Sequence, residues 1–414
     1  MSISLLRRTP TLGRDARLLV AGQIMSTFGD TLLIVGVPLM VLQVSGSAVQ
    51  VGFVVALTQA PTLLGFLARR LRRRTAGRSL LVAFDLLRMV AVALVAALLA
   101  IGPSTLPAVY ALLTVTSALA ALAAPTRGEL ATHVVSPDEL MRLNSYDRSG
   151  EALAVAAGAG AGGVLVAVSP IWTIFAIDAV TFLLSAATIL LLSTAVRRGR
   201  AGALDTTTER RPRGALLRNR AISLVLLAEA LTSLALGAFL ALFVVFVIRE
   251  LSAGSAVYGF LEMTQAAAAG AAGLLLARAT RPLAESQVPV IGYLGMGVVI
   301  VVLGLTSSLP LVFGLMVALG AVNILYAVGV RTLFQRVAAG GALLDVLAAE
   351  SVLSRGATVA GALAGAALLA SGAGTAGMLL SGAGALVIFS GLVARTGIAA
   401  RSTGGVPVER SADG

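Results

Sequence analysis

The stretch GSAVQVGF at residues 46–53 returns almost unchanged as GSAVYGF at residues 254–260. The tripeptide TQA follows each copy, at residues 58–60 and 264–266. Short matches arise by chance in a chain this rich in Gly and Ala. The repeat becomes informative only if the rest of the chain also divides into two similar halves.

The amino-acid composition identifies an integral membrane protein. Of the 414 residues, 58% are hydrophobic and 12% are charged, and the mean hydropathy is +0.97. Soluble domains carry about 25% charged residues, so a water-exposed fold is excluded. All 31 basic residues are Arg and lie between apolar segments, so the net charge of +12 does not indicate a nucleic-acid partner.

Several classes of site are excluded by residues that the chain lacks. It has no Cys, which rules out thiol catalysis and Cys metal sites, and the single His133 cannot build a His-rich metal site. The sequence contains no G-x-x-x-x-G-K-[ST] phosphate loop and no H-E-x-x-H or G-x-S-x-G motif. We therefore expect no enzyme, no metal and no cofactor.

Twelve segments are long and apolar enough to cross a bilayer, which takes about 20 residues for a core of ~30 Å. The predicted spans of the first half are 18–42, 49–68, 79–101, 105–125, 149–168 and 171–194. Those of the second half are 221–248, 256–277, 287–306, 309–330, 351–371 and 375–395.

The charges of the connections alternate along the chain. One set of loops is Arg-rich, including RRLRRRTAGR at 69–78 and RRGR at 197–200, and the other set is uncharged except for Arg249 and Glu250. Positively charged loops stay on the cytoplasmic side. We therefore expect an even number of spans in a bacterial inner (plasma) membrane, with both chain termini in the cytoplasm.

The repeat marks two equivalent halves. The first copy lies between spans one and two and the second between spans seven and eight, while Arg127 ends span four and Arg331 ends span ten, at offsets of 204 to 208 residues. This is the parallel-repeat organisation of secondary transporters. The predicted parts are a cytoplasmic N-terminus (1–17), a six-helix bundle (18–196), a cytoplasmic linker (197–220), a second six-helix bundle (221–396) and a disordered cytoplasmic tail (397–414).

Six stretches of the chain match the pattern of a known family. They are GQIMSTFGD (22–30), PLMVLQVSGSA (38–48), DLLR (85–88), APTRGELATHVVSPDELMRLNS (124–145), DAVTFLLSA (178–186) and NILYAVGVRTLFQRV (323–337). Through them the chain resembles, over residues 15–395, the major facilitator superfamily, and within it the branch of the enterobactin exporter and macrolide efflux proteins. The resemblance implies an all-α membrane protein of twelve transmembrane helices in two pseudo-symmetric six-helix bundles, which transports by alternating access on the proton gradient.

One loop departs from the pattern of that family. Between spans two and three the family has Gly, three residues and then Asp-Arg, whereas here Gly65 is followed by FLARRLRRR, which places Arg69 at the Asp position, with Arg70 after it. The family Asp is thought to lock the inward-closed face through charge pairing. The resemblance therefore leaves the gating role of the Gly65–Arg74 loop in doubt.

Four acidic residues inside spans are the candidates for proton coupling in a central cavity. Asp30 lies 12 residues into span one, about 18 Å deep, with no basic residue expected near it. An ionised Asp at this depth costs about 2.5–3.5 kcal/mol, so such residues face a cavity or a partner. Glu229 is similarly deep, and Asp178 and Glu262 lie about 10 Å from the outer side. For Asp30 and Asp178 a structural hydrogen bond is the alternative.

Uncharged polar residues within spans are candidates for the substrate cavity, with bonding between helices as the equal alternative. They are Gln23, Gln59, Gln265, Asn323 and Tyr326. The small-residue runs at 154–163 and 360–374 predict close helix contacts at equivalent places in the two halves.

Charged residues near the cytoplasmic ends of spans are candidates for gate contacts. Asp85 and Arg88 are one turn apart, which favours an ion pair, read as a structural clasp. Arg127 with Glu129 and Arg148 with Glu151 are expected to pair at the cytoplasmic face. The full set is Arg69, Arg70, Asp85, Arg88, Arg127, Glu129, Arg148, Glu151, Arg331 and Arg355.

The sequence thus predicts a monomeric secondary transporter in the lipid bilayer that exports a small amphipathic molecule, such as a drug, antibiotic or siderophore, by proton-coupled alternating access. An importer or lysolipid transporter of the same fold is one alternative. A non-transporting scaffold or sensor, which the altered loop favours, is another. A membrane-embedded enzyme is the weakest alternative because no nucleophile-base pair is visible.

Overall fold

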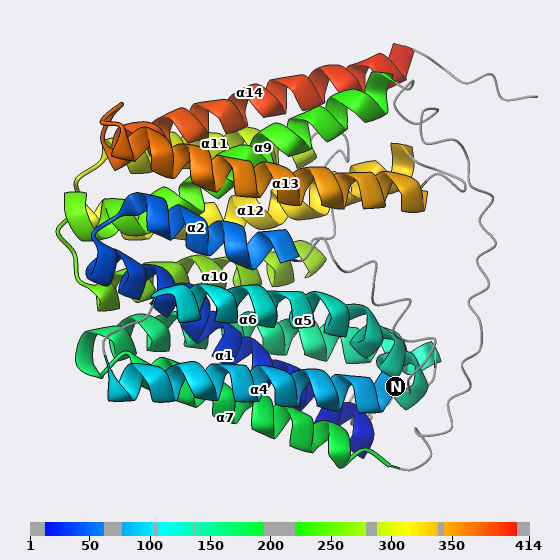
Figure 1. The fold of residues 1–414 in the computed structure, drawn as a ribbon. Helices are drawn as coiled ribbons and strands as arrows, with labels where there is room; N and C mark the ends of the chain where they lie inside the picture. Colours follow the sequence, from blue (N-terminus) through cyan, green and yellow to red (C-terminus); the bar gives the residue numbers. More distant parts are fainter. Residues whose placement is uncertain are drawn as a thin grey trace, which may run out of the picture.

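The computed structural model describes residues 13–61, 77–102, 106–135, 137–193, 220–278, 288–337 and 343–403. These residues form twelve α-helices (Figure 1). The first six are α1 (Arg14–Ser45), α2 (Ala48–Gln59), α4 (Gly77–Ile101), α5 (Leu106–Val134), α6 (Pro137–Val168) and α7 (Trp172–Leu190). The others are α9 (Arg220–Val245), which continues into the π-helical turn η3 (Phe246–Glu250), then α10 (Ser255–Arg278), α11 (Val288–Leu305), α12 (Leu309–Val337), α13 (Leu343–Ala370) and α14 (Ala376–Thr403).

The helices pack mainly within the first six and within the last six. In the first set α1 packs against α6 and α7, and α4 packs against α5 and α7. In the second set α9 packs against α13 and α14, α11 packs against α12 and α14, and α10 against α12. The most extensive contacts between the sets are those of α6 with α10 and of α2 with α13, and α2 also packs against α9. The predicted all-α fold of twelve helices is confirmed.

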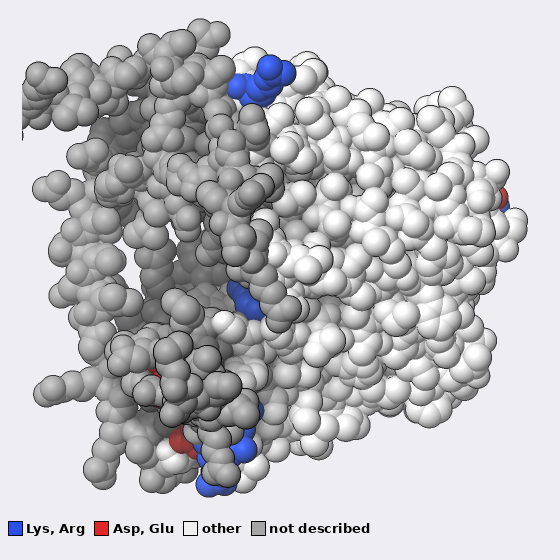
Figure 2. Space-filling view, turned by 180° about the vertical axis from the view of Figure 1, so that it is seen from behind, with Lys and Arg blue, Asp and Glu red and all other residues white. Residues whose placement is uncertain are grey.

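Eleven of these helices are long and apolar enough to span a membrane, and α2 is a shorter apolar helix over its described residues. The predicted second span, 49–68, runs beyond that part of the chain. Large apolar side chains point outward, with Leu153 and Leu305 each 72% exposed. Figure 2 shows a broad uncharged surface with Arg, Asp and Glu confined to its edges. Such a surface suits lipid and not water, so the protein crosses the membrane several times.

The two predicted small-residue faces lie where the two sets of helices meet. In the α6–α10 pair, a Cβ on Gly163 would lie 2.6 Å from the Cα of Gly259. In the α2–α13 pair, a Cβ on Gly52 would lie 2.9 Å from the carbonyl oxygen of Ala362. Atoms cannot approach this closely, so these backbones meet only because the side chains are absent. The predicted close approach is confirmed, and its role in gating stays a prediction.

A hydrogen bond links the two sets at one end of the molecule. The guanidinium of Arg249, at the end of η3, donates to the carbonyl oxygen of Gly46, which follows α1. The neighbouring Glu250 accepts from the backbone N–H of Gly377 (3.1 Å) and of Ala376, and so holds the first turn of α14. The one charged pair in the otherwise uncharged loops therefore caps one helix and bridges the two halves.

The protein is closed at this end. Gly52 and Gly259 both lie in the first turns of their helices, and Gly163 lies in the last turns of α6, next to the short connections that Arg249 bridges. The outer helices α14 and α7 diverge toward the opposite end (Figure 1). If the Arg-rich loops are cytoplasmic, as the sequence predicts, this closed end would be the outer one, and the orientation stays a prediction.

The Arg249 bridge should favour this closed state modestly. Because Arg249 is exposed, its removal in Arg249→Ala should raise the population open at this end by about two- to fivefold. The chain has no Cys, so spin labels on Ser47→Cys and Ala253→Cys report the distance across the closed end without background. Arg148→Ala, which breaks an exposed pair within α6, is the control. An unchanged distance distribution in Arg249→Ala would show that the bridge has no energetic role.

Candidate functional site

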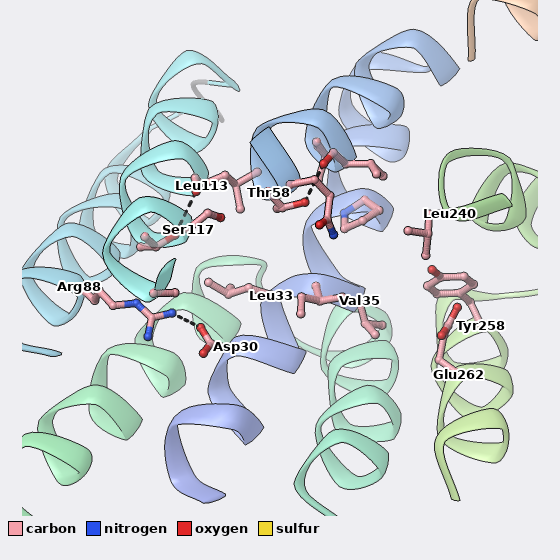
Figure 3. A pocket seen from close by; sticks show the side chains of 17 residues that line it. Asp30, Leu33, Val35, Thr58, Arg88, Leu113, Ser117, Leu240, Tyr258 and Glu262 are labelled. Atoms are coloured by element: carbon pink, nitrogen blue, oxygen red, sulfur yellow. Dashed lines mark hydrogen bonds and ion pairs between the residues drawn. The ribbon is translucent and has the colours of Figure 1, made fainter. Parts of the chain in front are cut away.

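A cavity of about 370 Å³ lies between the two sets of helices. Its walls come from α1, α2, α4 and α5 on one side and from α9 and α10 on the other (Figure 3). Apolar side chains make up much of the wall, including Leu33, Val55, Leu113 and Leu240. Its size falls within the ~300–1,000 Å³ of small-molecule sites. The cavity is therefore largely apolar, with a few polar groups in its wall.

The charged part of the first wall is an ion pair between Asp30 of α1 and Arg88 of α4. The Asp30 side chain is 35% exposed and the Arg88 side chain 7%, so the carboxylate opens toward the cavity and the guanidinium lies behind it. The guanidinium carbon of Arg88 also lies 4.0 Å from the ring centroid of Phe182, a cation–π contact. Protonation of Asp30 would remove the partner of a buried cation.

The expectation that no basic residue approaches Asp30 is wrong. Asp30 and Arg88 follow the starts of α1 (Arg14) and α4 (Gly77) by 16 and 11 residues, which is about 24 and 17 Å of helix. The long Arg side chain spans that difference in depth. The sequence gives the depth of a residue along its own helix. It does not show which residue of another helix lies beside it.

The predicted Asp85–Arg88 clasp is also wrong, because both residues pair with other helices. Asp85 accepts a hydrogen bond from the Ser185 hydroxyl (2.7 Å) and lies 3.7 Å from the guanidinium of Arg127. Arg127, predicted to pair with Glu129, also donates to the side-chain oxygen of Gln23. The two α4 residues point into the bundle toward different neighbours, and buried contacts between helices replace the pair along the helix.

Asp178 of α7 completes this charged cluster. It is fully buried, its Oδ1 accepts from the Thr181 hydroxyl (3.1 Å), and it interacts electrostatically with Asp30 and Arg88. Its Oδ2 has no hydrogen-bond partner among the residues that the structure describes. The cluster thus holds three carboxylates, of Asp30, Asp85 and Asp178, against two guanidiniums, those of Arg88 and Arg127. It is one positive charge short, which a proton could supply.

The opposite wall carries Tyr258 and Glu262, one turn apart on α10 (Figure 3). Both side chains line the cavity, with the Glu262 carboxyl beside the Tyr258 ring. The predicted Gln59 lines the cavity as well, from α2. Of the predicted cavity residues, Asp30, Gln59 and Glu262 therefore share one chamber.

Glu229 lies inside the second set of helices and not in this wall. It is 7% exposed and accepts hydrogen bonds from the hydroxyls of Tyr293 (3.0 Å) and Tyr326 (2.5 Å), whose rings meet edge to face at 5.0 Å. Tyr326, a predicted substrate contact, is thus occupied in joining α12 to α9. For both residues the structure supports the alternative of bonding between helices.

Removing one of these phenol donors should destabilise the fold. Tyr293→Phe leaves one oxygen of a buried Glu229 without its donor, at a cost of about 1–3 kcal/mol in the free energy of unfolding. Thermal unfolding of the purified protein measures it. Tyr146→Phe is the matched control, because Tyr146 is 53% exposed and should lose nothing. Equal stability of Tyr293→Phe and the parent would mean that Glu229 does not depend on this bond.

The remaining predicted residues are dispersed. Gln23 donates to the Thr27 hydroxyl (3.1 Å), and the side chains of Gln265 and Asn323 are half-buried outside the cavity wall. Arg148 donates to Glu151 (2.9 Å) on α6, and Nε of Arg355 lies 3.4 Å from the Ser351 hydroxyl. The loop with Arg69 and Arg70 and the side chains of Glu129 and Arg331 lie outside the described residues, so their gate roles stay predictions.

Several residues of the site were not predicted. Ser185 and Phe182 lie in the stretch DAVTFLLSA, of which the sequence singles out only Asp178 as a site residue. No sequence pattern indicates a role for Tyr293. Tyr258 could have been found, because a helical residue four positions before Glu262 shares its face.

The chain is similar to known membrane transporters in sequence and in fold. The family model of the Major Facilitator Superfamily matches residues 19–343, while a search of curated proteins finds no match. Among solved structures, a bacterial homologue of the iron transporter ferroportin, in its inward-facing state, is 17% identical, with a TM-score of 0.73 over 94% of this chain and 100% of its own.

Two other solved structures show the same fold with different named activities. The nucleoside transporter NupG is 10% identical, with a TM-score of 0.71 over 94% of this chain and 99% of its own. A D-xylose-proton symporter is 14% identical, with a TM-score of 0.70 over 92% and 96%. At these identities the likeness concerns the fold alone. By the family match over most of its length, the chain belongs to the major facilitator superfamily of membrane transporters.

Proposed function

We propose that the protein is a proton-coupled exporter of small amphipathic molecules that works by alternating access. The observation that carries the proposal is the Asp30–Arg88 pair in the wall of the cavity. A carboxylate that opens to the chamber can take up a proton. The buried guanidinium behind it then loses the negative charge that it pairs with. The energy source is then the proton gradient.

The proposed cycle follows from the shortage of positive charge in the cluster. When Asp30 is ionised it holds Arg88, and when it is protonated Arg88 is freed to interact more strongly with Asp178 or Asp85. Arg88 is on α4, Asp178 on α7 and Asp30 on α1, so this exchange would change which helices the guanidinium joins. Such an exchange is the two-state element that alternating access requires.

Export is the proposed direction, and it depends on the resemblance to the enterobactin and macrolide efflux branch in stretches such as residues 124–145. The apolar wall favours an amphipathic substrate over a sugar or nucleoside, which needs many hydrogen-bonding groups. The proposed site of action is a bacterial inner membrane, with the protein a monomer and both termini cytoplasmic.

The experiment is efflux from cells that express the protein, measured for a cationic dye and a panel of antibiotics and siderophores with and without an uncoupler. We expect at least one compound to leave faster than from cells without the protein, and the difference to vanish with the uncoupler. Efflux that persists in the uncoupler, or faster uptake in place of efflux, would contradict the proposal.

A further inference from the structure

We propose that Tyr258 and Glu262 form a subsite for the cationic group of an organic substrate, while Asp30 is reserved for the proton. This inference rests on the proposed transport function. It goes beyond that function by naming the charge of the substrate and the residues that bind the charged group. Both side chains line the cavity from α10, opposite the Asp30–Arg88 pair (Figure 3).

The cavity wall carries one carboxylate that no Arg neutralises. Asp30, Arg88 and Glu262 are the charged residues that line the cavity. Asp30 and Arg88 pair with each other. No Arg in the described ranges (13–61, 77–102, 106–135, 137–193, 220–278, 288–337 and 343–403) forms an ion pair with Glu262. The wall therefore offers one carboxylate that a ligand can neutralise.

An aromatic ring and apolar side chains lie beside that carboxylate. The Tyr258 ring lies next to Glu262, and a carboxylate with an aromatic ring is the pairing that binds ammonium groups by charge and by cation–π contact. Leu240, Val55 and Ile34 supply apolar surface in the same chamber. A ligand with a cationic head and an apolar body matches both features.

The cavity suits an organic cation better than it suits a metal ion or an anion. Within the described residues no three His, Cys, Asp or Glu side chains gather into a metal site, so a bare divalent cation lacks the oxygen ligands that it needs. An anionic siderophore would meet the unpaired Glu262 carboxylate in an apolar chamber and be repelled. The chemistry thus favours an amine or a quaternary cation.

The place of the subsite ties binding to the opening of the closed end. Gly259, which makes the close backbone contact with Gly163 of the other half, lies between Tyr258 and Glu262 in the same turns of α10. A ligand held by these side chains therefore acts on the helix that must move away from α6. Asp30 lies on the other wall, so substrate and proton do not compete for one carboxylate.

The test is equilibrium binding to the purified protein in lipid nanodiscs, without any gradient, with empty nanodiscs subtracted. The probes are tetraphenylphosphonium and tetraphenylborate, which share a shape and differ in the sign of their charge. We expect the wild type to bind the phosphonium at least about tenfold more tightly than the borate, and Glu262→Gln to lose at least about tenfold for the phosphonium. Glu262→Asp should retain part of the affinity. Asp15→Asn, which alters a hydrogen bond to the Ser193 backbone away from the cavity, should retain all of it.

Two results would overturn the inference. One is a wild type that binds the borate as tightly as the phosphonium, a comparison that needs no variant to fold. The other is a folded Glu262→Gln protein, by its melting temperature, that binds the phosphonium like the wild type. Because no gradient is present, failure here together with intact proton-linked efflux removes the cation subsite alone. Charge-selective binding without any proton-linked flux would instead contradict the proposed function.

Discussion

Asp30→Asn should abolish proton-driven transport, with a fall on the order of tenfold or more in gradient-driven accumulation of substrate in inside-out membrane vesicles. Asn has nearly the shape of a protonated Asp, but it can neither release a proton nor hold Arg88 as an ion. The cavity otherwise keeps its walls and Glu262, so the exchange of labelled for unlabelled substrate without a gradient should persist. Loss of driven transport with exchange retained is the signature of lost coupling.

The matched control is Asp15→Asn. Asp15 accepts a hydrogen bond from the Ser193 backbone at the far end of α1 (3.2 Å), away from the cavity, and its replacement should leave driven transport unchanged. A melting curve of Asp30→Asn shows whether the protein survives the loss of the partner of Arg88, since an unpaired buried charge costs several kcal/mol. If a folded Asp30→Asn protein accumulated substrate like the wild type, Asp30 would not be the proton-coupling residue. The proposal that the protein is an exporter would be unaffected.

Gly163→Leu should stop the transport cycle while leaving the membrane fold intact. A side chain here would begin 2.6 Å from both the Cα of Gly259 and the carbonyl oxygen of Ser255. Both are backbone atoms that cannot yield without moving α10. Because the contact lies at the closed end, the variant should be trapped open there, with transport reduced on the order of a hundredfold.

Spin labels on Ser47→Cys and Ala253→Cys in the Cys-free chain test this directly. In Gly163→Leu the distance across the closed end should shift to longer values in nearly all molecules. Gly382→Leu is the control, because a Cβ on Gly382 meets nothing within 4 Å, and its distances should match the parent. An unchanged distribution in Gly163→Leu, or full transport activity, would mean that α6 and α10 do not separate at this point during the cycle.

The fold could be predicted from the sequence because its causes are local. Hydrophobic length gives the spans, Arg in alternate loops gives an even number of them, and the repeat at 46–53 and 254–260 gives two equivalent halves. The small-residue runs predicted where backbones touch, since no other residues allow such an approach. These features predict the fold without any information about which helices pack against each other.

The candidate site was predicted only in part, because its partners come from different helices. Asp30 and Glu262 were identified as costly charges in the membrane, and both line the cavity. Arg88 was assigned to Asp85, its neighbour along the helix, although its partner lies 58 positions away on α1. Glu229 was indistinguishable from a cavity acid because nothing in the sequence places the Tyr293 hydroxyl beside it.

The fold itself leaves the substrate open. Structures named as an iron transporter homologue, a nucleoside transporter and a sugar symporter all share it, so specificity lies in the cavity wall. Here that wall is largely apolar, with one ion pair and the Tyr258–Glu262 pair. These few polar groups are therefore the places where substitutions should change what is transported.

The most direct test of proton-coupled transport is the movement of protons caused by substrate. The purified wild type is reconstituted into liposomes that contain a pH-sensitive dye, and an outward-directed gradient of tetraphenylphosphonium is imposed. We expect the lumen to become acidic as protons enter in exchange for the leaving cation, and Asp30→Asn to abolish this change. Wild-type liposomes that release the phosphonium faster than protein-free liposomes, without any change in luminal pH, would contradict it.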